Sequence, residues 1–371
     1  MKVLFTVQRI GRIGGSQGII RDLALGLRRR GHEVVVYCSV EPEPGATFAD
    51  ERIPVTSSLK DLPFAPDVIH AHHQFDAMAA VLALRGVPAV YCCHGATEMD
   101  KQPRHPRIVR YVAMSPTLKL RMAIESGIDE DSIDVVYNAV DLQRFRIVRE
   151  PPPRPRRALV YQRGFDPQSL LGRAIREAVT AAGMEMECRG IGNGMTPILN
   201  PEEVLPHYDI VFTSGKSAID ALAYGCAVIL IGRKTCGEMV SEANFDRSRR
   251  ANFSLPVNSP PPGAAEIAGE IARYSAGGVA ATTRRLRTAA DLEDYVDQMA
   301  AIYDQAMAIQ RRATPDPAAE TRAAAHYLRA LAPWAAQLDD AVSLTAPPEL
   351  SVLREDLLRQ VQATRRDHGT S

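Results

Sequence analysis

The sequence predicts an α/β protein of two similar domains followed by additional helices. Three observations carry this prediction. Short β-branched or aromatic runs alternate with helix-period segments over most of the 371 residues, a proline-rich segment interrupts the alternation at residues 150–157, and only helical patterns follow residue 264. The chain is also too long for one ordinary hydrophobic core.

The first part of the chain predicts one parallel sheet with helices on both faces. Alternating strands and helices require right-handed crossovers between parallel strands. We expect this domain over residues 1–149. Its strands are predicted at residues 2–7, 33–38, 67–71, 87–92, 109–114 and 133–137, and its helices at 16–30, 74–85 and 116–126.

Residues 150–157 are predicted to form a linker, because their prolines are incompatible with a strand. The alternation then restarts and predicts a second domain over residues 158–312. Its strands are expected at 158–162, 184–190, 209–213 and 226–231, and its helices at 168–182 and 216–224. A helical extension is expected over 313–371. Helical patterns at 281–311, 318–338 and 348–366 could cover a domain or join two copies in a homo-oligomer.

Composition narrows the function classes. Lys and Arg together number 44 and so do Asp and Glu, so no overall charge attracts the protein to nucleic acid. The apolar run at residues 2–7 is too short for a signal peptide or a membrane span. No CxxC pair occurs, which favours reduced, packed thiols and a cytoplasmic location, for the cysteines at positions 38, 92, 93, 188, 226 and 236.

A glycine-rich segment, Gly14-Gly15-Ser16, follows the first predicted strand and opens a helix. Glycines let backbone N–H groups approach a ligand, and a helix N-terminus attracts an anion. The segment does not match GxGxxG, so a dinucleotide site is not indicated. The structural alternative is a tight turn between strand and helix.

A second anion site is predicted where a strand ends at Thr213 and a helix begins within residues 214–217. Exposed N–H groups, the helix dipole, the Lys216 ammonium and the Ser217 hydroxyl would together favour a phosphate. A Walker A loop is excluded, because that motif needs a glycine at position 210, where the chain has Ile210.

Several motifs in order resemble the N-terminal half of family 4 glycosyltransferases of the GT-B fold. They lie at residues 14–18, 25–36, 66–72, 93–95, 112–115 and 137–145. The resemblance implies two Rossmann-like domains facing across a cleft and a metal-independent cytoplasmic enzyme. It implies a nucleoside-diphosphate-sugar donor held mainly by the C-terminal domain. The acceptor would be a glycan or a lipid-linked molecule, with peripheral contact to the inner face of the membrane.

The resemblance also assigns roles to individual residues. Arg163 and Lys216 would stabilise the diphosphate, and His94 would act in the active site. Asp220 stands where the family places a ribose-binding glutamate, and Glu238 stands where an acidic residue can contact the donor sugar. The other donor-binding residues would be Gly14, Gly15, Ser16, Gly192, Ser214, Gly215 and Ser217.

Two departures from the family pattern bear on the donor. The usual pair of glutamates seven residues apart is missing: the first has no counterpart, and the second is shortened to Asp220. Gln168 replaces a lysine expected five positions after Arg163. These departures and the long helical tail favour one alternative, a non-catalytic relative that kept the GT-B fold. A nucleotide-sugar epimerase, which shares the double-Rossmann shape, is the second alternative.

Two charged or polar clusters have several interpretations. His70, His72 and His73 would form a metal site, acceptor contacts or plain strand-end packing, and the sequence places no Cys or carboxylate at ligand spacing beside them. A basic run with prolines would be a solvated loop or a site for an anionic acceptor. It contains Lys101, Arg104, Arg107 and Arg110.

Overall fold

The computed structural model describes residues 1–10, 15–40, 53–95, 100–255 and 262–345. Its residues form two compact units. The first, Met1–Pro103 with Arg107–Pro315, contains both α/β domains. The second, Arg104–Pro106 with Asp316–Ser371, contains helix α11 (Pro317–Thr345), which carries Pro333 in its interior. The helix predicted at 348–366 lies outside the described residues.

The N-terminal domain is built on a seven-stranded parallel sheet in the order β3-β2-β1-β4-β5-β6-β7. Successive strands leave β1 in opposite directions, so a topological switch point lies between β1 and β4. In open α/β sheets ligands bind at such a point, beyond the carboxyl ends of the strands. The strands are β1 (Lys2–Thr6), β2 (Glu33–Tyr37), β3 (Val55–Thr56), β4 (Val68–Ala71), β5 (Ala89–Cys93), β6 (Ile108–Ala113) and β7 (Ile133–Val135).

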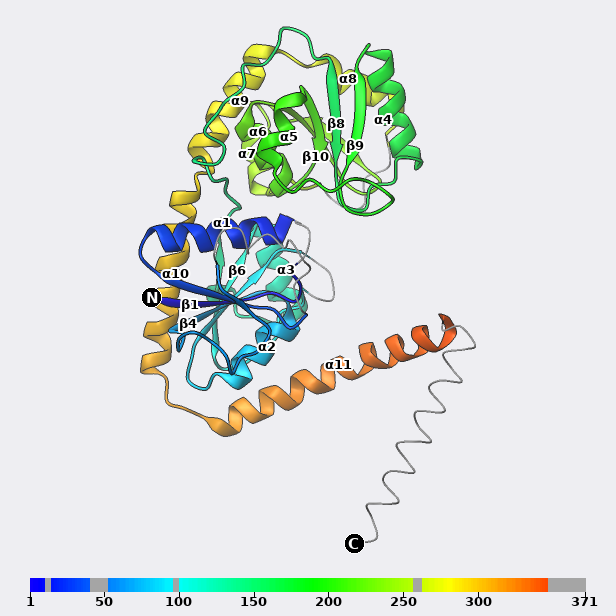
Figure 1. The fold of residues 1–371 in the computed structure, drawn as a ribbon. Coiled ribbons are helices and arrows are strands. Elements are labelled where there is room, and N and C mark those ends of the chain that lie inside the picture. Colours follow the sequence, from blue (N-terminus) through cyan, green and yellow to red (C-terminus); the bar gives the residue numbers. More distant parts are fainter. Residues whose placement is uncertain (11–14, 41–52, 96–99, 256–261, 346–371) are drawn as a thin grey trace. The chain divides into compact units, whose positions relative to one another are not determined.

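Helices cover this sheet on both faces (Figure 1). α1 (Gly15–Arg29) and α10 (Leu292–Arg312) pack together over one face. α2 (Gln74–Ala83) and α3 (Pro116–Ser126) contact the strands on the other side. Phe5 of β1 and Val296 and Tyr303 of α10 belong to one buried core. The N-terminal core is therefore completed by a helix from the far end of the chain.

The C-terminal domain has a five-stranded sheet in the order β12-β11-β10-β8-β9, in which only β12 is antiparallel. Its switch point lies between β8 and β10. α4 (Leu170–Ala181) and α8 (Ala264–Ala272) share one core, and α6 (Lys216–Tyr224) and α9 (Ala276–Ala289) share another. The strands are β8 (Arg157–Tyr161), β9 (Glu185–Arg189), β10 (Ile210–Thr213), β11 (Ala227–Ile231) and β12 (Cys236–Met239).

The structure corrects three sequence expectations. Strands β3 and β12 are not in the prediction, because one has only two residues and the other, Cys-Gly-Glu-Met, lacks β-branched residues. The single helix expected at 281–311 is two helices, α9 and α10. The break falls at Ala290-Asp291, where Asp291 pairs with Val140 in a β-bridge and its side chain caps α10 through the Glu293 N–H.

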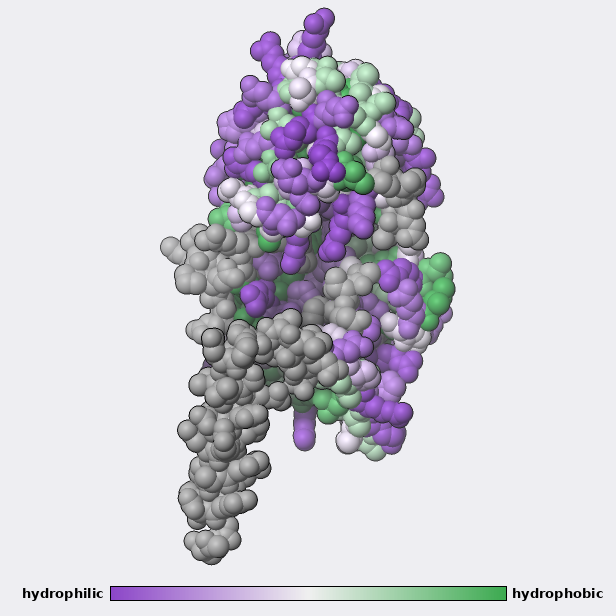
Figure 2. Space-filling view, turned by 90° about the vertical axis from the view of Figure 1, so that its right-hand side faces the viewer, coloured by the Kyte–Doolittle hydropathy of each residue, from purple (hydrophilic) through white to green (hydrophobic). Residues whose placement is uncertain are grey.

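On the face shown in Figure 2, hydrophilic residues predominate and hydrophobic ones form small separate patches. Among the described helices, none combines the length and apolar character needed to cross a bilayer. All six cysteines lie in described segments and none forms a disulfide.

Candidate functional site

The start of α6 is an uncapped helix N-terminus at the C-terminal switch point. Thr213 Oγ1 donates to the Tyr161 carbonyl at 2.6 Å, which ties the end of β10 to the end of β8. Gly215 then adopts φ 61° and ψ −134°, a conformation that glycine tolerates far better than other residues, and no side chain caps the helix. The first N–H groups of a helix have no acceptor inside it. α6 thus begins within residues 214–217, as the sequence predicts, and the anion site expected there stays a prediction.

Arg163 stands next to this helix start, in the turn after β8. Its side chain is exposed. The Gly164 N–H donates to the Ile191 carbonyl at 2.8 Å, so the loop after β9 lies against the Arg163 turn. A Cβ atom at Gly190 would lie only 2.4 Å from the Gln162 carbonyl oxygen. A Cβ atom at Gly192 would lie 3.7 Å from the Gly164 Cα. The close approach requires a glycine at position 190, whereas Gly192 is favoured by its backbone φ of 101°.

Lys216 has a different environment from the one expected for a mobile phosphate ligand. Its side chain is buried, and its ammonium binds Asp220 one turn along α6 and Asp22 of α1 at 3.3 Å. Burial alone would lower the pKa of Lys216, but the two carboxylates hold it above the ordinary value. Burial raises the pKa of Asp22 and of Asp220, against the opposing effect of Lys216. In this conformation Lys216 neutralises carboxylates, and Asp220 is engaged with it.

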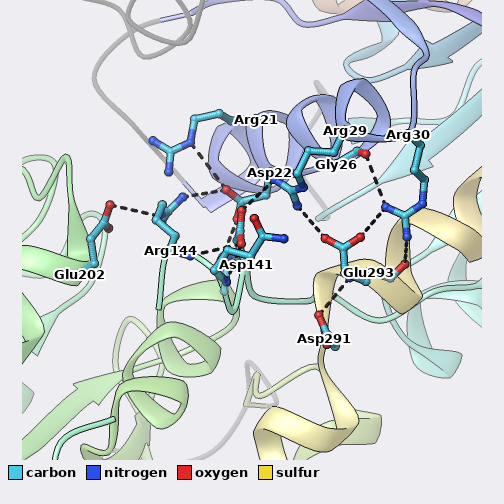
Figure 3. Close-up of polar contacts among 12 residues, drawn as sticks. Arg21, Asp22, Gly26, Arg29, Arg30, Asp141, Arg144, Glu202, Asp291 and Glu293 are labelled. Atoms are coloured by element: carbon cyan, nitrogen blue, oxygen red, sulfur yellow. Dashed lines mark hydrogen bonds and ion pairs between the residues drawn. The ribbon is translucent and has the colours of Figure 1, made fainter. Parts of the chain in front are cut away.

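Asp22 belongs to a network that joins the two domains (Figure 3). Arg144 donates to Asp22 at 2.7 Å and pairs with Glu202 of the C-terminal domain at 3.1 Å. Farther along α1, Arg29 and Arg30 bind Glu293 at the start of α10 at 2.8 and 2.6 Å. Charged residues of one face of α1 are thus held by partners from later in the chain.

His73 lies at the N-terminal switch point, just after β4. It has φ 56° and ψ 121° as the N-cap of α2, and its Nδ1 accepts the Gln8 N–H at 3.1 Å. A non-glycine residue with positive φ stores strain of the kind found at functional sites. Burial lowers the pKa of His73, Asp100 and Asp76 oppose this effect, and the positive charge of Arg163 adds to it. Arg163 of the second domain therefore acts electrostatically on the first.

His94 follows β5 in the same domain. Its Nε2 is buried and has no hydrogen-bond partner among the described residues. Burial lowers the pKa of His94 to about 4, with Asp100 opposing and His73 reinforcing the shift. The imidazole is therefore neutral near pH 7 and can accept a hydrogen bond or a proton. The sequence singles out His94, but His73 only as part of a cluster, because a backbone dihedral angle leaves no sequence signal.

His70 and His72, the other two histidines near the end of β4, form a buried hydrogen-bonded pair. His70 Nε2 and His72 Nε2 are 2.6 Å apart, and the Tyr303 hydroxyl lies 2.6 Å from His70 Nδ1. Cys92 of the adjacent strand approaches His70 Nδ1 at 3.7 Å, so a thiol does join the cluster through strand pairing. The ligand atoms of His70, His72 and Cys92 lie within 4.8 Å of one another, yet both nitrogens of His70 already have partners.

The other predicted residues are more dispersed. Gly14 lies outside the described residues, Gly15 begins α1, and Ser16 falls in its first turn. The Ser214 hydroxyl donates to Gln162 Oε1 at 3.2 Å. Ser217 hydrogen-bonds Tyr161, whose pKa burial nevertheless raises.

Glu238 is bound within its own domain. It lies on β12 and accepts from Asn244 at 2.9 Å and from Arg247 at 2.7 Å. The basic run also has internal partners: Arg107 is buried and donates to the Leu84 carbonyl at 2.6 Å, and Arg110 pairs with Asp134 at 2.6 Å. Neither interpretation of that run, a solvated loop or an anion site, fits these two arginines.

Comparisons with known proteins agree with this architecture. Residues 13–144 match the family model described as Glycosyltransferase Family 4. A glycosyltransferase from Rickettsia africae ESF-5 has a similar fold, with a TM-score of 0.56 and 15% identity, over 82% of this chain and 98% of the other. The apo form of the lipopolysaccharide outer core galactosyltransferase WaaB gives 0.52 and 14%, over 82% and 100%. No curated protein has a sequence that matches this chain.

The solved structures and the family model match different parts of the chain. At these identities the solved structures establish the fold alone, which spans both domains. The family model covers the N-terminal domain, including the helix that carries Asp22 and the strand that precedes His94. The chain has the GT-B fold of these glycosyltransferases, and its N-terminal domain matches the model of glycosyltransferase family 4.

Proposed function

We propose that the enzyme transfers a sugar from a nucleoside-diphosphate sugar to a hydroxyl group of a glycan or lipid-linked acceptor, without a metal. The observation that carries this proposal is the pairing of two switch points. One has Arg163 beside an uncapped helix start, and the other has His73 and His94. Arg163 lies close enough to His73 for its charge to add to the lowering of the His73 pKa.

The C-terminal side is suited to the leaving group. Negative charge builds on the departing diphosphate as the bond to the anomeric carbon breaks, through an oxocarbenium-like transition state. Pre-aimed donors stabilise such charge, each by about 3–4 kcal/mol in a closed site. Arg163 and the N–H groups of the α6 start supply them. Lys216 adds a further charge only if it exchanges Asp22 or Asp220 for phosphate oxygens.

The N-terminal side is suited to the acceptor and the sugar. A neutral imidazole with an unpartnered Nε2 can accept a hydrogen bond from a sugar or acceptor hydroxyl. His94 provides this group, and its pKa near 4 keeps it unprotonated under neutral conditions. Gly15 begins α1, and the proposal assigns it to the donor.

A nucleotide panel tests the donor. UDP-, GDP-, ADP- and TDP-sugars are added in turn, and the melting temperature is followed by differential scanning fluorimetry. A donor at 100 times its Kd adds about 2.7 kcal/mol. With a melting entropy of about 2.1 cal/mol/K per residue, this raises the melting temperature of a unit of about 310 residues by about 4 °C.

Variants then test the site. Arg163→Ala should lose the stabilisation and lower turnover about 100-fold, because one leaving-group donor is removed. Arg173→Ala is the matched control, since Arg173 is exposed on α4. Equal activity of Arg163→Ala and Arg173→Ala would contradict the proposed donor site. Nucleotide binding without turnover would favour a non-catalytic relative. Interconversion of one nucleoside-diphosphate sugar into another would favour an epimerase.

A further inference from the structure

The buried histidine pair links the site to α10. Tyr303 of α10 contacts His70 edge-on, with ring centroids 5.7 Å apart and an angle of 86°. His70 in turn contacts His72, and His72 stacks on His94 with centroids 4.7 Å apart and an angle of 22°. A continuous chain of side chains therefore runs from a helix near residue 300 to the imidazole at the site.

The donors and acceptors in this row of side chains can be assigned from the hydrogen bonds that each group needs. The Tyr303 hydroxyl is fully buried, and His70 Nδ1 is the hydrogen-bond partner that the described residues give it. A buried hydroxyl must donate its hydrogen or bear a desolvation penalty. Tyr303 therefore donates to Nδ1, and neutral His70 carries its own hydrogen on Nε2.

The same reasoning continues to His72. His70 Nε2–H donates to His72 Nε2, so neutral His72 carries its hydrogen on Nδ1. Burial lowers the pKa of both histidines well below the ordinary value, so both are neutral. His72 Nδ1 is buried without a hydrogen-bond partner among the described residues whichever direction of hydrogen bonding holds, and the opposite direction would leave the Tyr303 hydrogen unpartnered as well.

We propose that Tyr303 is a positioning residue of the active site: its hydroxyl fixes the tautomers of His70 and His72, and the fixed His72 ring holds the His94 imidazole by stacking. Without the Tyr303 hydroxyl, His70 can carry its hydrogen on either nitrogen, and the His72 ring can rotate about its Cβ–Cγ bond. The proposal rests on the role of His94 in the proposed function. Its structural part is measurable without activity.

Nitrogen-15 NMR of histidine-labelled protein tests the tautomers directly. The chain has nine histidines, few enough to resolve in one labelled sample. In the wild-type protein we expect His70 protonated on Nε2 and His72 on Nδ1. The opposite pattern, or an imidazolium at either residue at pH 7, would overturn the proposal. A stoichiometric metal ion found in the purified protein by mass spectrometry would do the same.

Tyr303→Phe then removes the hydroxyl and keeps the ring. We expect mixed tautomers at His70 and His72, shifted His94 signals, and a kcat lowered about 10-fold with the donor KM within twofold. Tyr295→Phe is the matched control, a buried tyrosine two turns earlier on α10 that makes no hydrogen bond to this pair among the described residues. If Tyr303→Phe matches Tyr295→Phe in both signals and kcat, Tyr303 has no positioning role.

The two proposals fail in different ways. The wild-type protein could show the expected tautomers, and its His94 signals could respond to Tyr303→Phe, while it transfers no sugar. This result would support the positioning role of Tyr303 and contradict the proposed function. An active enzyme with the opposite tautomers would contradict the positioning role of Tyr303 without contradicting the proposed donor site.

Discussion

Replacing Asp22 with asparagine should weaken the contact between the two domains by about 3 kcal/mol. The Asp22 carboxylate is buried and touches three cations: Arg144 at 2.7 Å, Lys216 at 3.3 Å and Arg21 at 3.6 Å. Breaking a buried ion pair typically costs about 3–5 kcal/mol. The lower end applies here, because Lys216 keeps Asp220 as a partner and burial already raises the pKa of Asp22.

This loss corresponds to a melting temperature lowered by about 5 °C, from a melting entropy of about 2.1 cal/mol/K for each of about 310 residues. Circular dichroism would follow unfolding of Asp22→Asn, Lys216→Met and the double variant. In the double-mutant cycle, the two sites should couple by about 1 kcal/mol or more. Glu125→Gln removes an exposed surface pair with Arg121 and should leave the melting temperature unchanged. Additive effects, or a shift as small as that of Glu125→Gln, would refute the interdomain role of Asp22.

Three further outcomes follow from the site. Because the pKa of His94 lies near 4, kcat should stay level from pH 8 to about 5 and fall as His94 is protonated near pH 4; a midpoint near 6.5 would contradict its buried, neutral state. The pKa of His94 in the folded protein lies below the value of about 6.5 in the unfolded chain, so stability is lost as pH falls from about 6.5 towards 4. The melting temperature should therefore drop less between pH 7 and 5 in His94→Gln than in the wild-type protein. Gly190→Ala should destabilise by about 2–3 kcal/mol, because its Cβ would lie 2.4 Å from the Gln162 oxygen, whereas Gly269→Ala, with open space around it on α8, should stabilise slightly in thermal melts.

Local patterns in the sequence predict most of the strands and helices. Parallel strands buried on both faces appear as short apolar runs, so β1 and β10 are predicted to within two residues. The turn at Gly215 and the start of α6 are also predicted, because strand, glycine and helix follow one another directly. A local pattern cannot show contacts between distant residues. Asp22 and Lys216 are almost 200 positions apart, and their ion pair depends on how two domains meet.

The histidine cluster shows the same limit in a smaller space. The structure brings His70 and His72 together, with their Nε2 atoms 2.6 Å apart, although β4 ends at Ala71, one residue before His72. Cys92 reaches them through pairing of β4 with β5, and Tyr303 through packing of α10, neither of which has a spacing signal. Strain at His73 depends on the turn into α2 and follows from tertiary structure alone.

The return of α10 to the first sheet has a consequence for synthesis on the ribosome. Phe5 and Val90 share one buried core with Val296 and Tyr303, which are translated some 200 to 300 residues later. At about 5–20 residues per second, the strands of residues 1–149 wait roughly 8–30 s for residue 312 to be added. During this interval α1 alone covers this face of the nascent sheet, and the part that α10 later covers stays exposed.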